Sequence, residues 1–288
     1  MDYEGVVRFA FDWLKEKESL KYLVPYCVLL IISSAISFLL TGVNATVFVP
    51  ATTQVPPLNQ VLNFVLGILF SLIFLYISGL VLVFALKRKN RNPPKFDFSK
   101  YIGMIKVIIV SAVFALLWCG NKKLRIVQLA CFVVSAISLL AAIILMLGNT
   151  GSFFPSLLFF LVLAFAIIVY IPVLIYTSVR YSMSLVVFLD AGLGAVDSAN
   201  KSWELTRGAV LEMIIASLLA GIVVAIAAGV VSLVVAFFAS IIGLPFGIFG
   251  AFFAFLMVFS MAFQTLAFIP QQFIEVAIYD NLLNRGRA

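Results

Sequence analysis

The chain alternates long apolar runs with shorter polar segments. Six runs each stay apolar over roughly the 20 residues that a helix needs to cross a bilayer, or longer. They cover residues 22–40, 61–86, 126–147, 153–179, 209–239 and 249–279. The apolar positions are contiguous and do not alternate, which favours helices over the strands of a barrel. The pattern therefore predicts an all-α fold: a polytopic membrane helix bundle with six transmembrane helices.

A less apolar segment precedes each predicted membrane hairpin. These segments are residues 3–21, 101–118 and 193–207. The apolar face expected in the first consists of Val6, Val7, Ala10, Trp13 and Leu14. Such a pattern is typical of an amphipathic helix at the membrane interface, and a solvated N-terminal helix fits it as well. We expect interfacial or re-entrant helices at all three segments, which makes a loose threefold repeat of interfacial helix and hairpin.

Residues 101–118 are apolar enough to cross the bilayer, so they are the ambiguous segment. If they crossed, Lys122, Lys123 and Arg125 would lie outside. If they do not cross, all 19 Lys and Arg residues fall on one side, as the positive-inside rule favours. Lys106 within the segment also argues against a lipid-exposed span. We therefore predict that residues 101–118 are interfacial or re-entrant and that both termini are cytoplasmic.

Composition agrees with a single integral membrane domain over residues 1–288. The chain is 64% hydrophobic and 11% charged, whereas a soluble domain is about 25% charged. The net charge of +7 suits cytoplasmic loops and anionic lipid headgroups, so we expect a cell-membrane protein that binds no nucleic acid. The chain lacks His, and its three Cys residues lack metal-ligand spacing, so we predict no metal site, no cofactor and no disulfide framework.

The longest polar-rich segment between two apolar runs covers residues 180–208, and we call it the elbow. At helical spacing within it lie Leu193, Val196, Asn200 and Trp203. Asp197 and Lys201 are four residues apart and are predicted to pair, and Gly208 suits a helix C-terminal cap.

Two interpretations of the elbow stay open. It is either a connector, with an interfacial Trp as anchor, or a surface that binds lipid or a protein partner. The candidate contacts for the second interpretation are Trp203, Lys201, Arg207 and Arg180.

The run DSANKSWELTRG at residues 197–208 resembles an element of a poorly characterised family of six-span membrane proteins in bacteria and archaea. This family is related to the membrane domain found with some glycerophosphodiester phosphodiesterases. Its Ser-Trp-x-Leu-Thr-x-Gly pattern is matched by Ser202, Trp203, Leu205, Thr206 and Gly208. Ser198 departs from the usual Ala, and the Pro often found before the acid at Asp190 is missing. The resemblance implies a six-span fold and no agreed activity.

Few polar residues lie near membrane depth. They form a candidate inner-leaflet polar cluster of Lys106, Glu212, Glu275 and Gln264. The two Glu residues should lie at similar depth in an antiparallel hairpin, where Arg180 or Lys106 neutralises them. Such a cluster binds a lipid phosphate or gates a path, and the alternative is snorkelling with structural pairing.

Small residues recur every four positions on the fifth predicted span. They are Ser217, Gly221, Ala225 and Gly229. Small side chains at this spacing let two helices approach closely, so we predict that this face packs against another helix.

Catalytic residues are not predicted, because paired midplane carboxylates, His, a G-x-S-x-G motif and a phosphate loop are missing from the sequence. The leading function is a non-catalytic polytopic membrane protein that engages membrane lipids, a membrane-protein partner or a second copy through its cytoplasmic interfacial helices. A transporter of a small amphiphile or lipid is the alternative. An intramembrane lipid enzyme is third, and it requires Glu212 and Glu275 to converge on a pocket.

Overall fold

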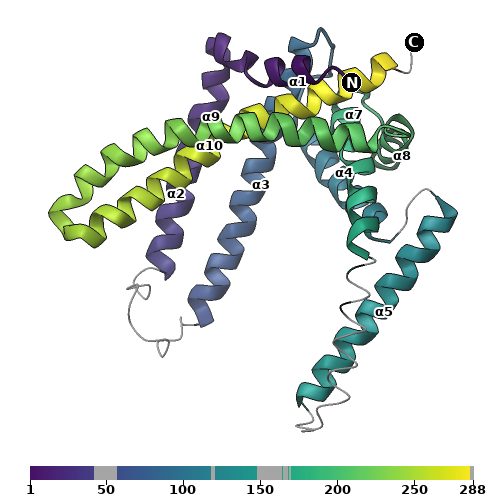
Figure 1. The fold of residues 1–288 in the computed structure, drawn as a ribbon, viewed down its shortest axis with the longest axis horizontal. Coiled ribbons are helices and arrows are strands. Elements are labelled where there is room, and N and C mark those ends of the chain that lie inside the picture. Colours follow the sequence, from purple (N-terminus) through teal and green to yellow (C-terminus); the bar gives the residue numbers. More distant parts are fainter. Residues whose placement is uncertain (42–56, 118–120, 148–163, 165–167, 169, 286–288) are drawn as a thin grey trace. The chain divides into compact units, whose positions relative to one another are not determined.

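The structure is a computed structural model that describes the chain apart from residues 42–56, 118–120, 148–163, 165–167, 169 and 286–288. Every regular element in the described residues is a helix, and these residues form no strand. The structure therefore confirms the predicted all-α membrane helix bundle (Figure 1).

The first half of the chain forms four long helices after a short N-terminal helix and two 3-10 turns. The elements are α1 (Tyr3–Ala10), η1 (Asp12–Lys15), η2 (Lys17–Ser19), α2 (Leu20–Thr41), α3 (Pro57–Arg88), α4 (Phe98–Leu116) and α5 (Lys122–Leu147). The second half contains a helical stretch at residues 170–181, two short helices and a long hairpin. These last elements are α7 (Ser184–Ala191), α8 (Ala195–Leu205), α9 (Val210–Gly243), η3 (Leu244–Phe246) and α10 (Gly247–Arg285).

Five helices in the described residues are long and apolar enough to cross a membrane. They are Phe64–Arg88, Phe98–Leu116, Tyr170–Ala191, Val210–Gly243 and Gly250–Arg285. Three of them coincide with the runs predicted at residues 61–86, 209–239 and 249–279. The runs at 22–40 and 126–147 are helical as α2 and α5, and most of the run at 153–179 lies outside the described residues. Because α4 meets the same length and composition criteria, its non-spanning orientation stays a prediction.

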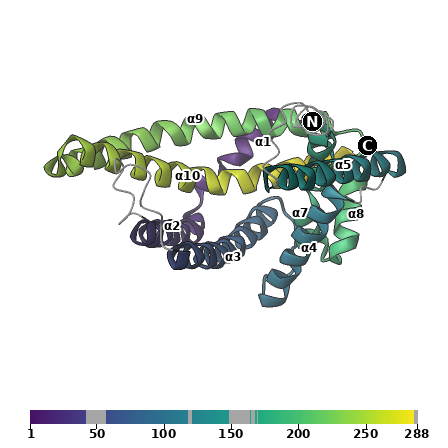
Figure 2. The same cartoon turned by 90° about the horizontal axis from the view of Figure 1, so that it is seen from below.

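The chain divides into two compact units. Unit 1 comprises Met1–Asn92 and Ile215–Asn281, and unit 2 comprises Pro93–Ile214 and Leu282–Ala288. In unit 1, α2 packs along α3, and α9 and α10 run side by side (Figures 1 and 2). In unit 2, α4, α7 and α8 contact one another.

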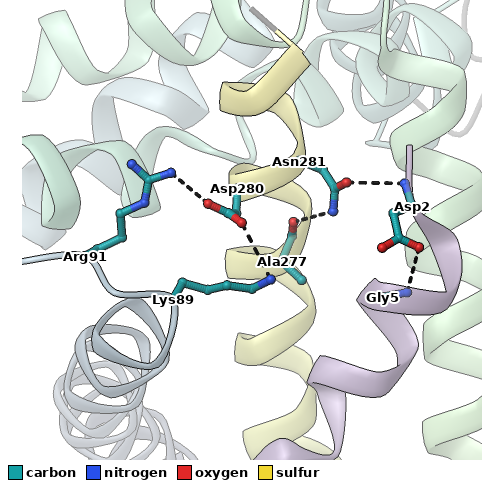
Figure 3. A network of polar contacts seen from close by, with 7 residues as sticks. All are labelled: Asp2, Gly5, Lys89, Arg91, Ala277, Asp280 and Asn281. Carbon is teal, nitrogen blue, oxygen red and sulfur yellow. Dashed lines mark hydrogen bonds and ion pairs between the residues drawn. The ribbon is translucent and has the colours of Figure 1, made fainter. Parts of the chain in front are cut away.

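Aromatic and ionic contacts hold unit 1 together near its N-terminus. The Phe9 ring on α1 lies 5.0 Å from the Phe273 ring on α10. Asp280 on α10 accepts from Arg91 at 2.7 Å and lies 3.6 Å from the Lys89 ammonium, so two cations at the end of α3 meet one carboxylate (Figure 3). We call these three residues the Asp280 lock.

Residues 3–21 do not form one continuous helix, so this part of the prediction is wrong. After α1, the backbone forms the 3-10 turns η1 and η2. Val6, Ala10 and Trp13 are buried, as the expected apolar face requires, but Leu14 is 64% exposed. The shift from 3.6 to 3.0 residues per turn rotates Leu14 away from that face. The interfacial position of the segment stays a prediction.

The predicted packing stripe on α9 is displaced by one residue. At Gly221 and Gly229, an added Cβ would meet no atom within 4 Å. The buried stripe consists of Ala216, Ala220, Val224, Ala228, Ser232 and Ala236. Both sets recur every four residues and consist mostly of small residues, so their spacing alone does not distinguish them. Because α9 is apolar on every side, its sequence does not show which of the two sets is buried.

Candidate functional site

The elbow is held in place by one buried cation. The side chain of Arg180, at the end of the helical stretch 170–181, is only 5% exposed. Its Nε donates to Thr206 Oγ1 at 3.1 Å, one terminal nitrogen donates to Tyr176 Oη at 3.0 Å, and the other donates to the Trp203 carbonyl. Its guanidinium carbon lies 3.8 Å from the centroid of a Trp203 ring. A desolvated cation–π contact of this kind contributes about 2 kcal/mol or more.

The same arginine receives hydrogen bonds on its backbone. Ser202 Oγ donates to the Arg180 carbonyl at 2.7 Å. Thr206 Oγ1 lies 3.3 Å from that carbonyl and 2.8 Å from the Ser202 carbonyl. Ser202, Trp203 and Thr206 of the elbow motif therefore all contact Arg180. We call this set, with Tyr176, the Arg180 lock.

The residues that the sequence places at helical spacing in the elbow are mostly exposed. Leu193 and Val196 are 37% and 49% exposed, and Asn200 is exposed as well. The face that packs toward α4 and α7 consists of Ser198, Ala199, Ser202 and Thr206. Only small side chains fit here, because α8 packs against two helices at once. Of the four residues that the sequence places at helical spacing, Trp203 is the half-buried one.

Lys201 pairs with Glu204 at 3.4 Å, where the sequence predicted a pair with Asp197. This pair is solvent-exposed and connects no other element in the described structure. Arg207 is also exposed, after the last turn of α8. Gly208 has a φ of +74°, which agrees with its predicted place at the end of this helix.

A cavity of about 560 Å³ lies between α4, α7 and α8 of unit 2. Its lining consists of Phe98, Ser99, Lys100, Ile102, Gly103, Lys106, Phe188, Gly194 and Ala195. We call it the lysine cavity, because two of these residues are cationic. The Lys100 ammonium lies 5.2 Å from the centroid of the Phe188 ring, so the cation borders an apolar wall.

The N-terminus of α8 forms one edge of the lysine cavity. Gly194 is the N-cap residue, and no side chain caps the helix there. Two carboxylates lie near the rim: Asp97 accepts from the Lys100 backbone N–H at 2.8 Å, and Asp197 lies in the first turn of α8. Neither lines the cavity. The lining therefore carries positive side chains, backbone N–H groups and apolar surface together.

A second cavity, of about 320 Å³, lies between α9 and α10 of unit 1. Its lining consists of Ser217, Gly221, Val224, Ala225, Phe263, Ala267, Gln271, Ile274 and Glu275. We call it the glutamate cavity. Three of the four small residues predicted to pack against a helix form one wall of it: Ser217, Gly221 and Ala225. This explains why the Cβ position of Gly221 meets open space.

The predicted inner-leaflet polar cluster is distributed over several places. Lys106 lines the lysine cavity and Glu275 lines the glutamate cavity. Glu212 pairs with Arg285 at 2.8 Å and lines neither cavity. Gln264 donates to Ser260 at 3.2 Å, one turn away on α10. The expectation that Arg180 or Lys106 neutralises Glu212 is wrong, because that carboxylate pairs with Arg285.

Three residues that matter for these sites were missed from the sequence. Tyr176 lies four residues before Arg180 on one helix, a spacing that predicts contact. Phe188 and Lys100 are far apart in the chain, and no local pattern connects them. In the described residues, no group of three or more His, Cys, Asp or Glu side chains could hold a metal ion.

Comparison of the chain with family models, with curated proteins and with solved structures finds no match. The resemblance of residues 197–208 to a six-span membrane family therefore stays a prediction. What can be said of function depends on the geometry of the two cavities and the elbow.

Proposed function

We propose that this chain is a non-catalytic membrane protein that binds an anionic phospholipid in the lysine cavity. The single observation behind this proposal is the combination of Lys100 and Lys106 with an apolar wall in one cavity. A lipid phosphate needs cations and N–H donors, while the glycerol and acyl carbons need apolar surface. The apolar surface of this cavity comes from Phe98, Ile102 and Phe188.

The size of the cavity supports a lipid headgroup. Its volume of about 560 Å³ falls within the range of roughly 300–1,000 Å³ that small-molecule sites occupy. The cavity lies between α4 and α8, which contain two of the three segments predicted to lie at the membrane interface. In our proposal both segments sit at the inner leaflet of the cell membrane, both termini are cytoplasmic, and six helices cross.

Lipid binding assigns the elbow a supporting role. The Arg180 lock keeps α8 against α4 and α7, so the N-terminal edge of α8 stays at the cavity. Lys201 and Arg207 are exposed outside it and can contact headgroups in general. Transport is the weaker alternative, because it needs a polar path that includes Gln264 and Glu275. Gln264 does not line the cavity that holds Glu275.

The test is lipid retention by the double variant Lys100→Gln, Lys106→Gln. The protein is reconstituted with equal parts phosphatidylglycerol and phosphatidylcholine, extracted gently and analysed by native mass spectrometry. A Lys near an anionic surface contributes about 1 kcal/mol, so we expect the preference for phosphatidylglycerol to fall roughly 10- to 30-fold.

The matched control is Lys122→Gln, Lys123→Gln, which removes the same charge from exposed positions at the start of α5. It should leave the preference within about 2-fold. Equal losses in the two double variants would show that net charge alone selects the lipid. An unchanged preference in the cavity variant would refute binding at this site.

A further inference from the structure

Glu275 is a membrane-depth carboxylate that the proposed lipid site does not use. It lies on α10, partly buried, and lines the glutamate cavity with Gln271 and Phe263. Among the described residues it forms no hydrogen bond and no ion pair. A carboxylate in such a place is costly unless something neutralises it.

The two helices that form the cavity cannot supply the neutralising charge. In the sequence of α9 there is no Lys or Arg, and α10 contains only Arg285. Arg285 pairs with Glu212 at 2.8 Å. The cations of the Asp280 lock, one turn or more beyond Glu275, pair with Asp280. An ionised Glu275 therefore takes its counter-charge from outside these contacts.

The lining of the cavity selects a particular kind of cation. A divalent metal ion needs about six oxygen ligands, and this lining offers only the side chains of Glu275, Gln271 and Ser217 with polar atoms. The rest is apolar or aromatic. A single carboxylate among apolar side chains suits a monovalent ammonium group whose carbon substituents occupy the apolar surface.

We propose that the glutamate cavity binds a monovalent organic cation, an ammonium group that carries a small apolar body. The ammonium meets Glu275, and the apolar body lies along the wall made by Gly221, Val224 and Ala225. The volume of about 320 Å³ is at the lower end of the range for small-molecule sites. Gly221 has no atom within 4 Å of its Cβ position, so this wall is open to a ligand.

The probe is benzyltrimethylammonium, whose neutral isostere is neopentylbenzene. Binding of each is measured by equilibrium dialysis with the full-length protein in nanodiscs of phosphatidylcholine. We expect saturable binding of the cation and none of the isostere. Glu275→Gln keeps the shape of the side chain and removes its charge, and it should weaken cation binding roughly 10- to 100-fold. Glu212→Gln serves as the charge-matched control, because it removes an equal charge outside the cavity.

A second pair of variants tests the place of binding without touching charge. Gly221→Leu fills the cavity, whereas Gly229→Leu adds the same side chain at an equally open position that does not line it. Both changes favour the helix, so both proteins should fold. We expect Gly221→Leu to abolish binding and Gly229→Leu to preserve it. Equal binding by wild type and Glu275→Gln, or equal loss in both glycine variants, or no saturable binding by wild type, would overturn the proposal.

Discussion

The lysine cavity and the glutamate cavity have linings of opposite charge. The lysine cavity of unit 2 lies among a long helix and two short ones, and its polar side chains are cationic. The glutamate cavity of unit 1 lies between two long helices, and its charged side chain is an anion. The cations and the anion thus lie in different cavities, each among apolar residues. One apolar chain thus places a cationic and an anionic lining in separate cavities.

A glycine lines each cavity, and the two glycines have opposite roles. An added Cβ at Gly103 would lie 2.3 Å from the Phe188 ring, whereas at Gly221 it would meet nothing within 4 Å. Gly103 is therefore needed for close packing of α4 against α7. Gly221 leaves space that nothing in the described structure occupies.

The variant with the largest expected effect should disrupt the lysine cavity and leave the glutamate cavity intact. Arg180→Ala removes a buried cation–π contact and three hydrogen bonds, so we expect unit 2 to lose about 3–5 kcal/mol of stability. Hydrogen exchange in α8 should rise and the preference for anionic lipid should vanish, while benzyltrimethylammonium binding is unchanged. Arg207→Ala, which removes an exposed arginine of the same elbow, is the control. Unchanged exchange in α8 of Arg180→Ala would show that the Arg180 lock does not hold this helix.

Substitutions at Gly103 and Gly221 should change stability by smaller amounts and in opposite directions. Gly103→Ala forces the buried Phe188 ring to move and should lower thermal stability in detergent by about 1–3 kcal/mol. Gly221→Ala meets open space and should raise stability by about 0.5–1 kcal/mol through helix propensity. Shifts of the same sign in the two variants would contradict the contrast between a packed and an open glycine.

The smallest effect concerns the Asp280 lock in unit 1. Asp280→Asn leaves Lys89 and Arg91 close together without a carboxylate, and all three side chains are partly buried. We expect a loss of about 1 kcal/mol, since partial exposure screens the charges. The loss should shrink in high salt, because screening also weakens the repulsion between the two cations. Anionic lipid retention should stay at its wild-type level, and a fall would mean that the lock also supports the lysine cavity.

The sequence was a good guide wherever one physical quantity decides the structure. Apolar length predicts the long helices, and the structure confirms the helical runs at residues 61–86, 209–239 and 249–279. The gap between the fifth and sixth runs contains the break between α9 and α10, where Gly247 has a φ of +84°. Sequence was a poor guide to the buried face of α9, because this helix carries no apolar stripe that only one orientation can bury.

In the candidate sites too, the sequence predicts some features and not others. Lys106, Glu275 and the elbow residues stand out in the sequence because charge and Trp are rare in an apolar chain. Their partners do not, since Arg180 meets Thr206 across 26 residues and Glu212 meets Arg285 across 73. Loop closure of that length is possible in many ways, and only the packing of the intervening helices selects one of them.

By itself, the sequence determined that this protein is a bundle of apolar helices in a membrane, because no water-soluble core could bury so much apolar surface. The tertiary structure alone decided that Arg180 packs against Trp203 and does not pair with a glutamate. It also decided that Ser217, Gly221 and Ala225 of α9 line a cavity and that the buried stripe lies one residue before them. The physical reason is that hydrophobicity acts on every apolar residue alike, whereas hydrogen bonds and cation–π contacts require particular atoms at particular distances.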